Sequence, residues 1–314
     1  MPELPEVETV RRQLEPEVVG RTIERAEVLD ERWTRPEPPA SVERALAGRR
    51  IEAVSRRGKY LIVRLDAGKV LVMHLRMTGN LLLRPATSDA VADLMETDRL
   101  GGPRLYESEP ELAHLRARLE LDDGSELLFT DVRRFGTGAV LDTDDLEEYL
   151  ARRAGIEPLT EALTAEAICE LAAGRRAPLK SFLLSQAGVA GIGNIYADEA
   201  LWRAELHPLS PAGSMRIEHC QALRQAIVET LELALANRGS SIDDYRDLRG
   251  ERGSMQDEFV VHTREGQECS RCGTEIRRIV VGGRSTYFCP GCETRLRRRR
   301  RTSRGRRARS GSRS

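Results

Sequence analysis

The chain has 314 residues, of which 40% are apolar, so it can bury a substantial core and should divide into two or three domains. No stretch approaches the ~20 consecutive apolar residues of a membrane span, and the acidic start lacks the basic and apolar regions of a secretory signal, so we expect a cytoplasmic protein. The formal net charge of zero conceals an asymmetry, because residues 295–314 contain eleven arginines and no acid, which leaves 39 bases (50 − 11) against 50 acids in residues 1–294.

The first third of the chain has one helical segment followed by strands. Apolar residues recur every three or four positions from residue 4 to 14, and Pro5 and Glu6 suit the first turn of a helix. Alternating or continuous apolar runs then predict five strands, in the segments IEAVSRR, YLIVRL, KVLVMHL, LRARLEL and ELLFT. We therefore expect a β-sandwich or barrel-like domain over residues 1–144.

The pattern changes twice along the rest of the chain. Between Arg84 and Glu111 the periodicity lapses, which indicates a long loop. Residues 145–253 return to a helical period, clearest in MRIEHCQALRQAIVETLELALA, and predict a second domain of three or four helices. Cys169 and Cys220 fall on such helices, where we expect small core side chains without a redox role.

Four cysteines near the C-terminus have the spacing of a metal site. Cys269 and Cys272 form one CxxC pair, and Cys289 and Cys292 form a second pair after sixteen residues. This arrangement predicts one tetrahedral Zn²⁺, which is structural because all four ligands come from the protein. The segment between the pairs predicts a hairpin that turns at GG and presents Arg284 at its tip, within a zinc finger over residues 254–293.

Two further motifs carry possible contacts with nucleic acid. The segment GVAGIGNIYADEA places glycines before a helix that opens with Asn194, and it predicts either an anion cradle or a structural turn between two helices. In DVRRFG, Arg133 and Phe135 pair a cation with an aromatic ring that suits insertion between base steps, although ordinary packing is an alternative. Met77, in HLRMTG, fits either a gap-filling loop residue or a core methionine.

The first residues suggest covalent chemistry. Removal of the initiator Met would leave Pro2 as a secondary amine, and an α-amino group titrates near ~8, so part of it is an unprotonated nucleophile at neutral pH. An iminium formed with a sugar carbon would act as an electron sink, and Glu3 could transfer protons beside it. The alternative is a disordered acidic tip. The Arg-rich tail over residues 294–314 is expected to be disordered and either adds attraction to phosphates or aids solubility alone.

Seven motifs in order resemble the bifunctional formamidopyrimidine-DNA glycosylase family. They cover Met1 to about Glu293 and read MPELPEVETVRR, RRGKYL, HLRMTG, DVRRFG, GIGNIYADE, REGQECSRCG and GGRSTYFCPGC. The resemblance implies an α+β multidomain fold, with an N-terminal β-sandwich and its leading helix, a helix–two-turns–helix domain, and a C-terminal zinc-finger β-hairpin.

The resemblance also implies roles for single residues. Pro2 matches the nucleophile, Glu3 the general acid, Lys59 the lysine of β-elimination and Arg284 the arginine of δ-elimination. Residues matched to DNA contacts are the three that fill the void left by an everted nucleotide, together with a histidine, an arginine and an asparagine: Met77, Arg133, Phe135, His114, Arg175 and Asn194. Two departures from the family are Val132, where proline is usual, and arginines at positions 175 and 176, where lysines are common.

From this resemblance we expect a DNA glycosylase and abasic-site lyase of base-excision repair. It would act as a monomer on double-stranded DNA that contains oxidised bases or abasic sites, in a bacterial cytoplasm and on the nucleoid. The start PELPE favours oxidised purines such as 8-oxoguanine and formamidopyrimidines. Two alternatives remain at this stage, an endonuclease VIII-like enzyme for oxidised pyrimidines and a non-catalytic zinc-ribbon protein that binds DNA.

Overall fold

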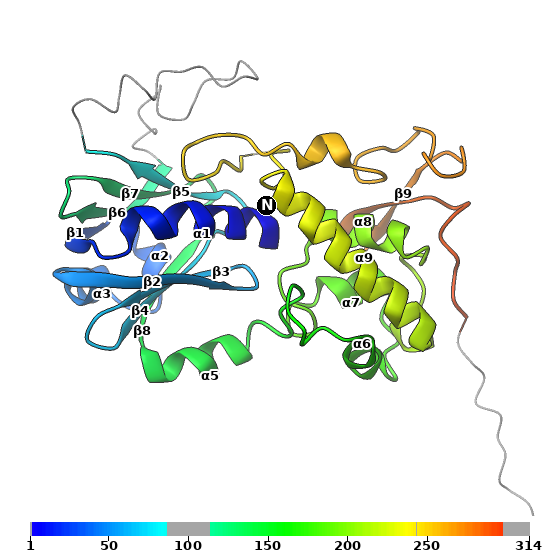
Figure 1. Ribbon diagram of the computed structural model, residues 1–314, viewed down its shortest axis with the longest axis horizontal. Coiled ribbons are helices and arrows are strands. Elements are labelled where there is room, and N and C mark those ends of the chain that lie inside the picture. Colours follow the sequence, from blue (N-terminus) through cyan, green and yellow to red (C-terminus); the bar gives the residue numbers. More distant parts are fainter. Residues whose placement is uncertain (1, 87–113, 243, 298–314) are drawn as a thin grey trace, which may run out of the picture.

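The computed structural model describes residues 2–86, 114–242 and 244–297. Figure 1 shows two bodies, a β-rich half and a helical half, with the N-terminal end of the chain between them. The predicted loop from Arg84 to Glu111 and the Arg-rich tail lie largely outside the described residues. Among the described residues, no helix combines the length and the apolar character that a membrane crossing requires.

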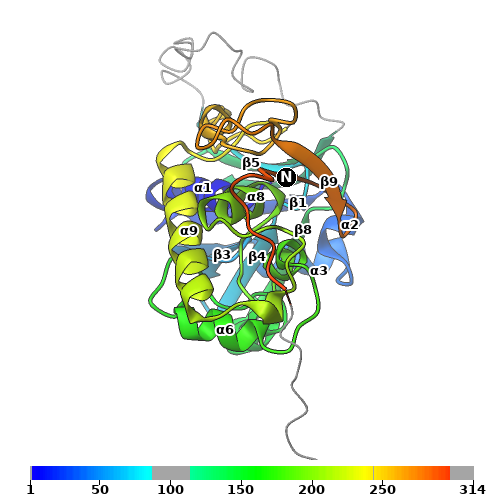
Figure 2. The ribbon, with the colours of Figure 1, turned by 90° about the vertical axis from the view of Figure 1, so that its right-hand side faces the viewer.

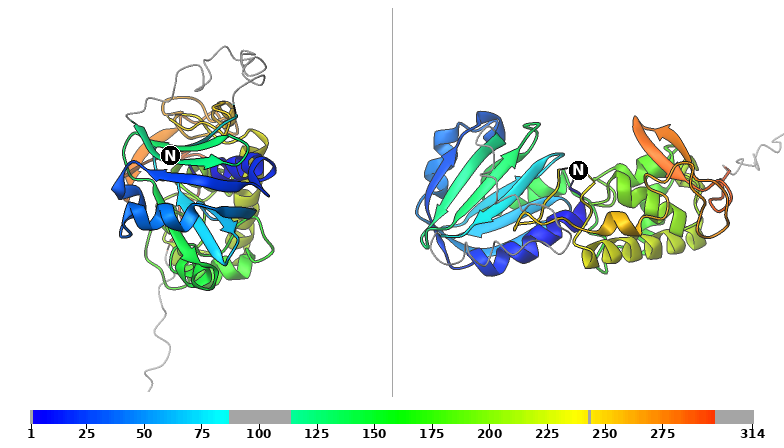
Figure 3. Two further views of the ribbon diagram at one scale, coloured as in Figure 1. Left: turned by 90° about the vertical axis from the view of Figure 1, so that its left-hand side faces the viewer. Right: turned by 90° about the horizontal axis from the view of Figure 1, so that it is seen from above.

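The first half is an antiparallel β-sandwich of eight strands in the order β5-β7-β6-β1-β2-β3-β4-β8. Its strands are β1 (Thr22–Val28), β2 (Arg49–Arg57), β3 (Tyr60–Leu65), β4 (Lys69–His74), β5 (Gly79–Arg84), β6 (Leu115–Leu121), β7 (Glu126–Asp131) and β8 (Thr137–Asp142). β1 and β2 pair through two residues only, Thr22 with Arg50 and Ile23 with Arg49. The chain bends at this short pairing, so that β5, β7, β6 and β1 form one layer and the other four strands form the second (Figure 3).

Helix α1 (Leu4–Val18) closes the opening between the two layers. Val7, Val10 and Leu14 pack with strand residues of both layers in one apolar core. The short helices α2 (Glu31–Thr34) and α3 (Pro39–Leu46) cover another side, where Trp33 lies over β8. Gly138 leaves the space for this ring, because a Cβ there would lie 2.2 Å from a Trp33 ring carbon.

The second half is helical and continues into the zinc-finger segment. α5 (Leu146–Ala151), which follows a 3₁₀ turn at Thr143–Asp145, packs on β3 and β4 of the sandwich. The α-helices of the second half are α6 (Ala165–Ala172), α7 (Leu179–Leu184), α8 (Asn194–Arg203) and α9 (Ile217–Ala236), with short 3₁₀ turns at Ala212–Ser214 and Met255–Glu258. The hairpin of β9 (Arg277–Val281) and β10 (Arg284–Phe288) packs beside α8 (Figure 2). The expected fold class is therefore confirmed, from the leading helix to the terminal hairpin.

The prediction for Cys169 and Cys220 is wrong. Both lie in or against the helical core, as expected, but their sulfurs form a disulfide between α6 and α9, with Cα atoms 5.9 Å apart. The reason is the packing of these two helices, which places the two cysteines on facing sides. Periodicity identified the buried side of each helix but could not show which buried residues meet.

Some strands and helices of the structure were not predicted from the sequence. The structure adds β1, β5 and β8 to the five predicted strands, and the described part of residues 145–253 holds five α-helices rather than three or four. The extra helices are short, since α5 and α7 have six residues each. Segments of this length give fewer than two helical turns, so their period is hard to recognise.

We predict that the disulfide stabilises the helical half. Replacing both Cys169 and Cys220 by alanine should lower the free energy of unfolding by up to about 4 kcal/mol, because the bond closes a loop of 51 residues and restricts the unfolded chain. Urea unfolding without a reductant measures this change. With a reductant, the wild type and the double variant should differ much less. Equal stability of the two proteins under non-reducing conditions would show that the bond does not form or does not matter.

Candidate active site

The first residues of the chain are buried between the two halves of the molecule. Pro2 and Glu3 are buried, and Leu4 donates its backbone N–H to the carbonyl oxygen of Gly191 at 3.0 Å. Leu4 belongs to the helical core, whereas Val7, one turn later, belongs to the core of the sandwich. The first turn of α1 is thus inserted into the other half, and the alternative of a disordered tip does not describe this structure.

The carboxylate of Glu3 occupies the N-terminus of α8. It accepts the backbone N–H of Gly193 at 2.5 Å and that of Ile195 at 3.0 Å. Free N–H groups and the helix dipole both favour a negative charge at this position. The glycine-rich segment therefore does form an anion cradle, and the anion that it holds is a side chain of the same protein. A Cβ at Gly193 would lie 2.3 Å from the Glu3 carboxyl carbon, so only glycine fits.

Glu6 supports this arrangement from one turn later. Its carboxyl group accepts the backbone N–H of Glu3 at 2.7 Å, the backbone N–H of Ser240 at 2.7 Å and the hydroxyl of Tyr196. Burial and, next, the charge of Glu3 raise the pKa of Glu6 above its ordinary range. Glu6 thereby connects α1 to α8 and to the segment after α9, a role that its sequence position did not reveal.

Lys59 lies on the turn between β2 and β3, and hydrogen bonds from both halves of the molecule hold this turn. Arg56 donates to the carbonyl oxygen of Gly58 at 2.8 Å, while Glu157, from the helical half, accepts the N–H of Gly58 at 2.8 Å. Arg56 and Glu157 also form an ion pair at 2.7 Å. Lys59 itself is 6% exposed, and burial lowers its pKa, with Glu3 and Glu6 acting in the opposite direction.

Arg284 begins β10 immediately after the turn at Gly282 and Gly283, whose φ angles are 58° and 75°. Both angles are positive, as a tight hairpin turn requires. Arg284 borders two neighbouring cavities of about 580 Å³ and 200 Å³. Lys59 lines the larger cavity and Glu3 the smaller one, so the hairpin brings Arg284 to the groups at the start of the chain.

The three residues matched to void filling gather at the larger cavity. Met77 and Phe135 line it, and the guanidinium of Arg133 lies 5.0 Å from the centroid of the Phe135 ring. Phe135 is 51% exposed and Met77 is only half-buried. The alternatives of a core methionine and ordinary aromatic packing do not fit these positions.

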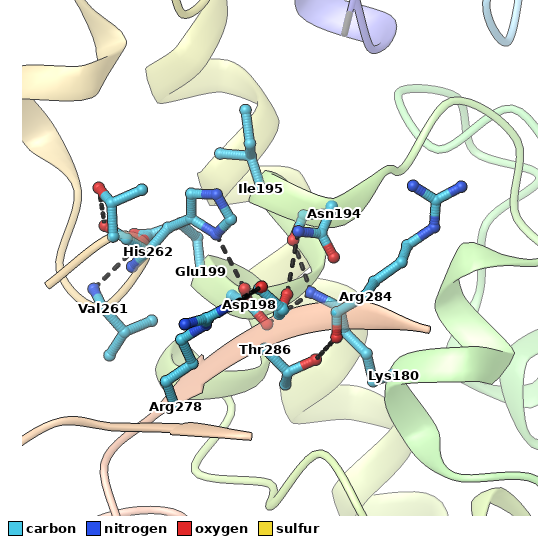
Figure 4. A network of polar contacts seen from close by, with 12 residues as sticks. Lys180, Asn194, Ile195, Asp198, Glu199, Val261, His262, Arg278, Arg284 and Thr286 are labelled. Atoms are coloured by element: carbon cyan, nitrogen blue, oxygen red, sulfur yellow. Dashed lines mark hydrogen bonds and ion pairs between the residues drawn. The ribbon is translucent and has the colours of Figure 1, made fainter. Parts of the chain in front are cut away.

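A buried polar network connects α8 to Lys180 of α7 and to His262 (Figure 4). Lys180, which is fully buried, donates to the carbonyl oxygen of Asn194 at 2.6 Å and to Asp198 at 2.5 Å, and the other oxygen of Asp198 lies 2.8 Å from Nδ1 of His262. Figure 4 shows Arg284 extending away from this network. The signal in the sequence was a lone lysine in the apolar segment LKSFLL, and it was missed.

Three further residues were matched to DNA contacts of the family: Asn194, Arg175 and His114. Asn194 donates its side-chain N–H to the carbonyl oxygen of Ser285 at 3.0 Å, which ties α8 to the hairpin next to Arg284. Arg175 is exposed before α7, with its guanidinium 5.7 Å from the Phe182 ring. His114 directly precedes β6 and lines neither of the two cavities described above. Their contacts with DNA remain predictions.

The four cysteines predicted as metal ligands lie close enough to share one ion, with all sulfur atoms within 4.8 Å of one another. The sulfurs of Cys269 and Cys292 are 3.8 Å apart, and those of Cys272 and Cys289 are 3.4 Å apart. A tetrahedral zinc with Zn–S distances of about 2.3 Å needs sulfur–sulfur distances of about 3.8 Å. The residues therefore fit one structural Zn²⁺. Trp202 of α8 donates its indole N–H to Cys269 at 3.3 Å, which connects this site to the helical half.

Comparisons with known proteins agree with this geometry. Residues 1–138 match the family described as the formamidopyrimidine-DNA glycosylase N-terminal domain, residues 154–246 match the H2TH domain of the same glycosylase, and residues 266–295 match a zinc finger found in FPG and IleRS. A formamidopyrimidine-DNA glycosylase of Chloroflexus aggregans is 46% identical over 93% of this chain and 98% of its own. Two solved structures are similar at 36% identity and a TM-score of 0.79. One is Lactococcus lactis Fpg with abasic-site DNA, covering 93% of this chain and 100% of that one, and the other is MutM with DNA containing carbocyclic 8-oxo-G, covering 94% and 100%.

We predict a distinct pH dependence of stability from Glu6. Because its folded pKa is raised above the ordinary value of 4.5, its contribution to stability is fully present below about pH 4.5 and is lost as the pH rises through the folded pKa. Glu6→Gln cannot titrate, so the free energy of unfolding of the wild type minus that of the variant should fall with rising pH. Denaturant unfolding across pH measures it, with exposed Glu232→Gln as the control. The prediction would be contradicted if this free-energy difference changed with pH no more steeply for Glu6→Gln than for Glu232→Gln.

Proposed function

The chain belongs to the formamidopyrimidine-DNA glycosylase family, and from this premise we propose that it excises oxidised purines from duplex DNA and then cuts the strand at the abasic site. The observation that carries the proposal is that Pro2 and Glu3 are buried and that the Glu3 carboxylate binds the N-terminus of α8, beside cavities that Lys59 and Arg284 line. Its substrates would be 8-oxoguanine and formamidopyrimidines in double-stranded DNA.

Base release begins at Pro2. After removal of the initiator Met, the nitrogen of Pro2 attacks C1′ of the deoxyribose, the glycosidic bond breaks, and the departing base takes the bonding electron pair and a proton. The sugar ring opens and an iminium joins Pro2 to C1′. Glu3 acts as the general acid by relaying a proton: its carboxylate, fixed next to Pro2 by two backbone N–H groups, takes the proton that the Pro2 nitrogen loses and passes it to the departing base or the ring oxygen.

Strand cleavage follows from the positive charge of the iminium. It acidifies the C2′ proton, and loss of that proton expels the 3′ phosphate in β-elimination, after which a second elimination expels the 5′ phosphate. Lys59 is suited to proton transfer because burial lowers its pKa below the usual range of a lysine. Arg284 carries a permanent charge at the edge of both cavities, where it can assist the departure of the second phosphate.

Eversion of the damaged nucleotide costs a few kcal/mol, which contacts with the emptied stack must offset. The exposed ring of Phe135, the neighbouring guanidinium of Arg133 and the side chain of Met77 are placed to enter the gap. We infer that Asn194 and Arg175 contact phosphates, and that His114 contacts DNA. We also infer a monomer that works on the nucleoid in a bacterial cytoplasm, where such DNA is found.

The test of the proposed function is trapping with sodium borohydride. Wild-type protein incubated with an 8-oxoguanine:C duplex should yield a covalent complex through reduction of the iminium, and Pro2→Gly should yield about a hundredfold less, because a primary amine on a flexible residue replaces the rigid secondary amine. A thymine glycol:A duplex should be trapped far less than the 8-oxoguanine duplex.

Denaturing electrophoresis of labelled DNA quantifies the product. No trapped complex with any of these duplexes would leave a non-catalytic DNA-binding protein as the better description. Preferential trapping with thymine glycol would instead favour the endonuclease VIII-like substrate range.

A second prediction concerns the position of Glu3. Gly193→Ala should lower the single-turnover rate of base excision by at least about a hundredfold, because the new Cβ displaces the Glu3 carboxylate from α8. Gly188→Ala in the same loop is the matched control, since its nearest neighbour would be a carbonyl oxygen at 3.6 Å. Comparable rates for the two variants would argue against a role for the α8 terminus in placing Glu3.

A further inference from the structure

Two loops emerge side by side where the pairing of β5 and β7 ends. Gly79, the first residue of β5, is paired with Asp131, the last residue of β7. The loop before β5 carries Met77, and the loop after β7 carries Arg133 and Phe135. We refer to residues 77–78 and 131–136 together as the wedge loops. Asp131 lies at their junction and is 1% exposed.

The carboxylate of Asp131 binds both wedge loops at once. Its Oδ2 accepts the backbone N–H groups of Phe135 at 2.8 Å and Gly136 at 2.6 Å. Its Oδ1 accepts the hydroxyl of Thr78 and the backbone N–H of Arg133 at 3.2 Å. The N–H of Arg133 is also 3.1 Å from the Thr78 hydroxyl oxygen. One buried carboxylate thus has four donors, three from its own loop and one from the other.

A second anchor fixes the middle of the longer loop. Arg134 has a φ of 61°, a left-handed conformation that is uncommon for a residue with a side chain. Its guanidinium contacts the carboxylate of Asp30 twice, at 2.5 Å and 2.9 Å, and Asp30 is only 4% exposed. The guanidinium of Arg134 is therefore tied back to the protein, although Arg134, like its neighbours Arg133 and Phe135, is exposed.

We propose that Asp131 and Thr78 are positioning residues that hold Met77, Arg133 and Phe135 as one preassembled wedge. This inference rests on the proposed function, and it adds to it two residues that touch neither the substrate nor the reacting atoms. Val132 is consistent with it, since position 132 lacks the proline that would stiffen the loop by itself. Hydrogen bonds to a buried carboxylate supply the rigidity instead.

The physical advantage is that the wedge is ordered before it meets DNA. An exposed loop that carried large side chains on an unrestrained backbone would lose conformational freedom on insertion, and this loss would reduce the free energy available for eversion. Because the Asp131 contacts already order the wedge loops in the folded protein, this conformational freedom is lost on folding and not on insertion into DNA. They should therefore affect steps that need insertion into a duplex and leave intact the chemistry at Pro2.

The test compares a substrate that needs the wedge with one that does not. An 8-oxoguanine:C duplex requires eversion, whereas a single-stranded abasic site has no opposing base and no stack to fill. Thr78→Val removes the hydroxyl at nearly constant shape and should lower the single-turnover excision rate on the duplex by about tenfold, with single-stranded abasic cleavage changed by less than about twofold. Thr78→Ser restores the hydroxyl and should recover most of the loss. Asp131→Asn should behave like Thr78→Val or worse.

Asp123→Asn is the matched control. It makes the same change in the turn at the other end of the β6–β7 hairpin, where Asp123 accepts the N–H and the hydroxyl of Ser125. A readout independent of catalysis comes from 2-aminopurine placed beside the base opposite a tetrahydrofuran abasic analogue. Its fluorescence change on binding at saturating protein should be reduced in Thr78→Val and normal in Asp123→Asn.

Three outcomes would overturn the inference. The first is that neither Thr78→Val nor Asp131→Asn changes the duplex excision rate or the fluorescence response. Another is an equal loss on the single-stranded and duplex substrates, which would indicate a general structural role, and the third is the same loss in Thr78→Ser as in Thr78→Val. Wild-type protein that cleaves neither substrate would count against the proposed function alone, because the fluorescence response still reports wedge insertion.

Discussion

The arrangement of this molecule depends on the contact between the Glu3 carboxylate and the N-terminus of α8. Two backbone N–H groups, from Gly193 and Ile195, hold it in a position where a helix favours negative charge. A carboxylate buried without such donors would be strongly destabilised. The contact therefore does two things. It makes burial of the chain start possible, and it connects the β-sandwich to the helical half at the place where Pro2 lies.

Two further contacts place the remaining groups, one across the same boundary and one between α8 and the hairpin. Glu157 of the helical half holds the turn before Lys59 through the N–H of Gly58. Asn194 of α8 holds the hairpin through the carbonyl oxygen of Ser285, next to Arg284. Neither half contains a complete site. Because Glu3 and the turn before Lys59 are both held by groups of the helical half, the docking of the two halves and the geometry of the site are one structural property.

The zinc-finger segment takes part in the same arrangement. Its role follows from position rather than from chemistry at the metal, since four cysteine ligands leave no place for water or substrate. Trp202 of α8 contacts the cysteine cluster at one end of the helix, while Glu3 and Asn194 lie at the other end. α8 thus connects the metal site and the start of the chain, and the hairpin between the two cysteine pairs presents Arg284 to the cavities.

The sequence by itself determined the order of the domains, the strands with strong alternation, the four metal ligands and, through ordered motifs, the family and its candidate residues. These features depend on local spacing, which a linear chain displays directly. It did not reveal the Cys169–Cys220 bond, the buried Lys180 network or the Asp131 contacts with both wedge loops. Each of those joins segments that approach only when helices and strands pack, and residue type alone does not specify a partner. The anion held at α8 is the clearest case, because the glycines predicted a cradle and only the packed fold showed that Glu3 fills it.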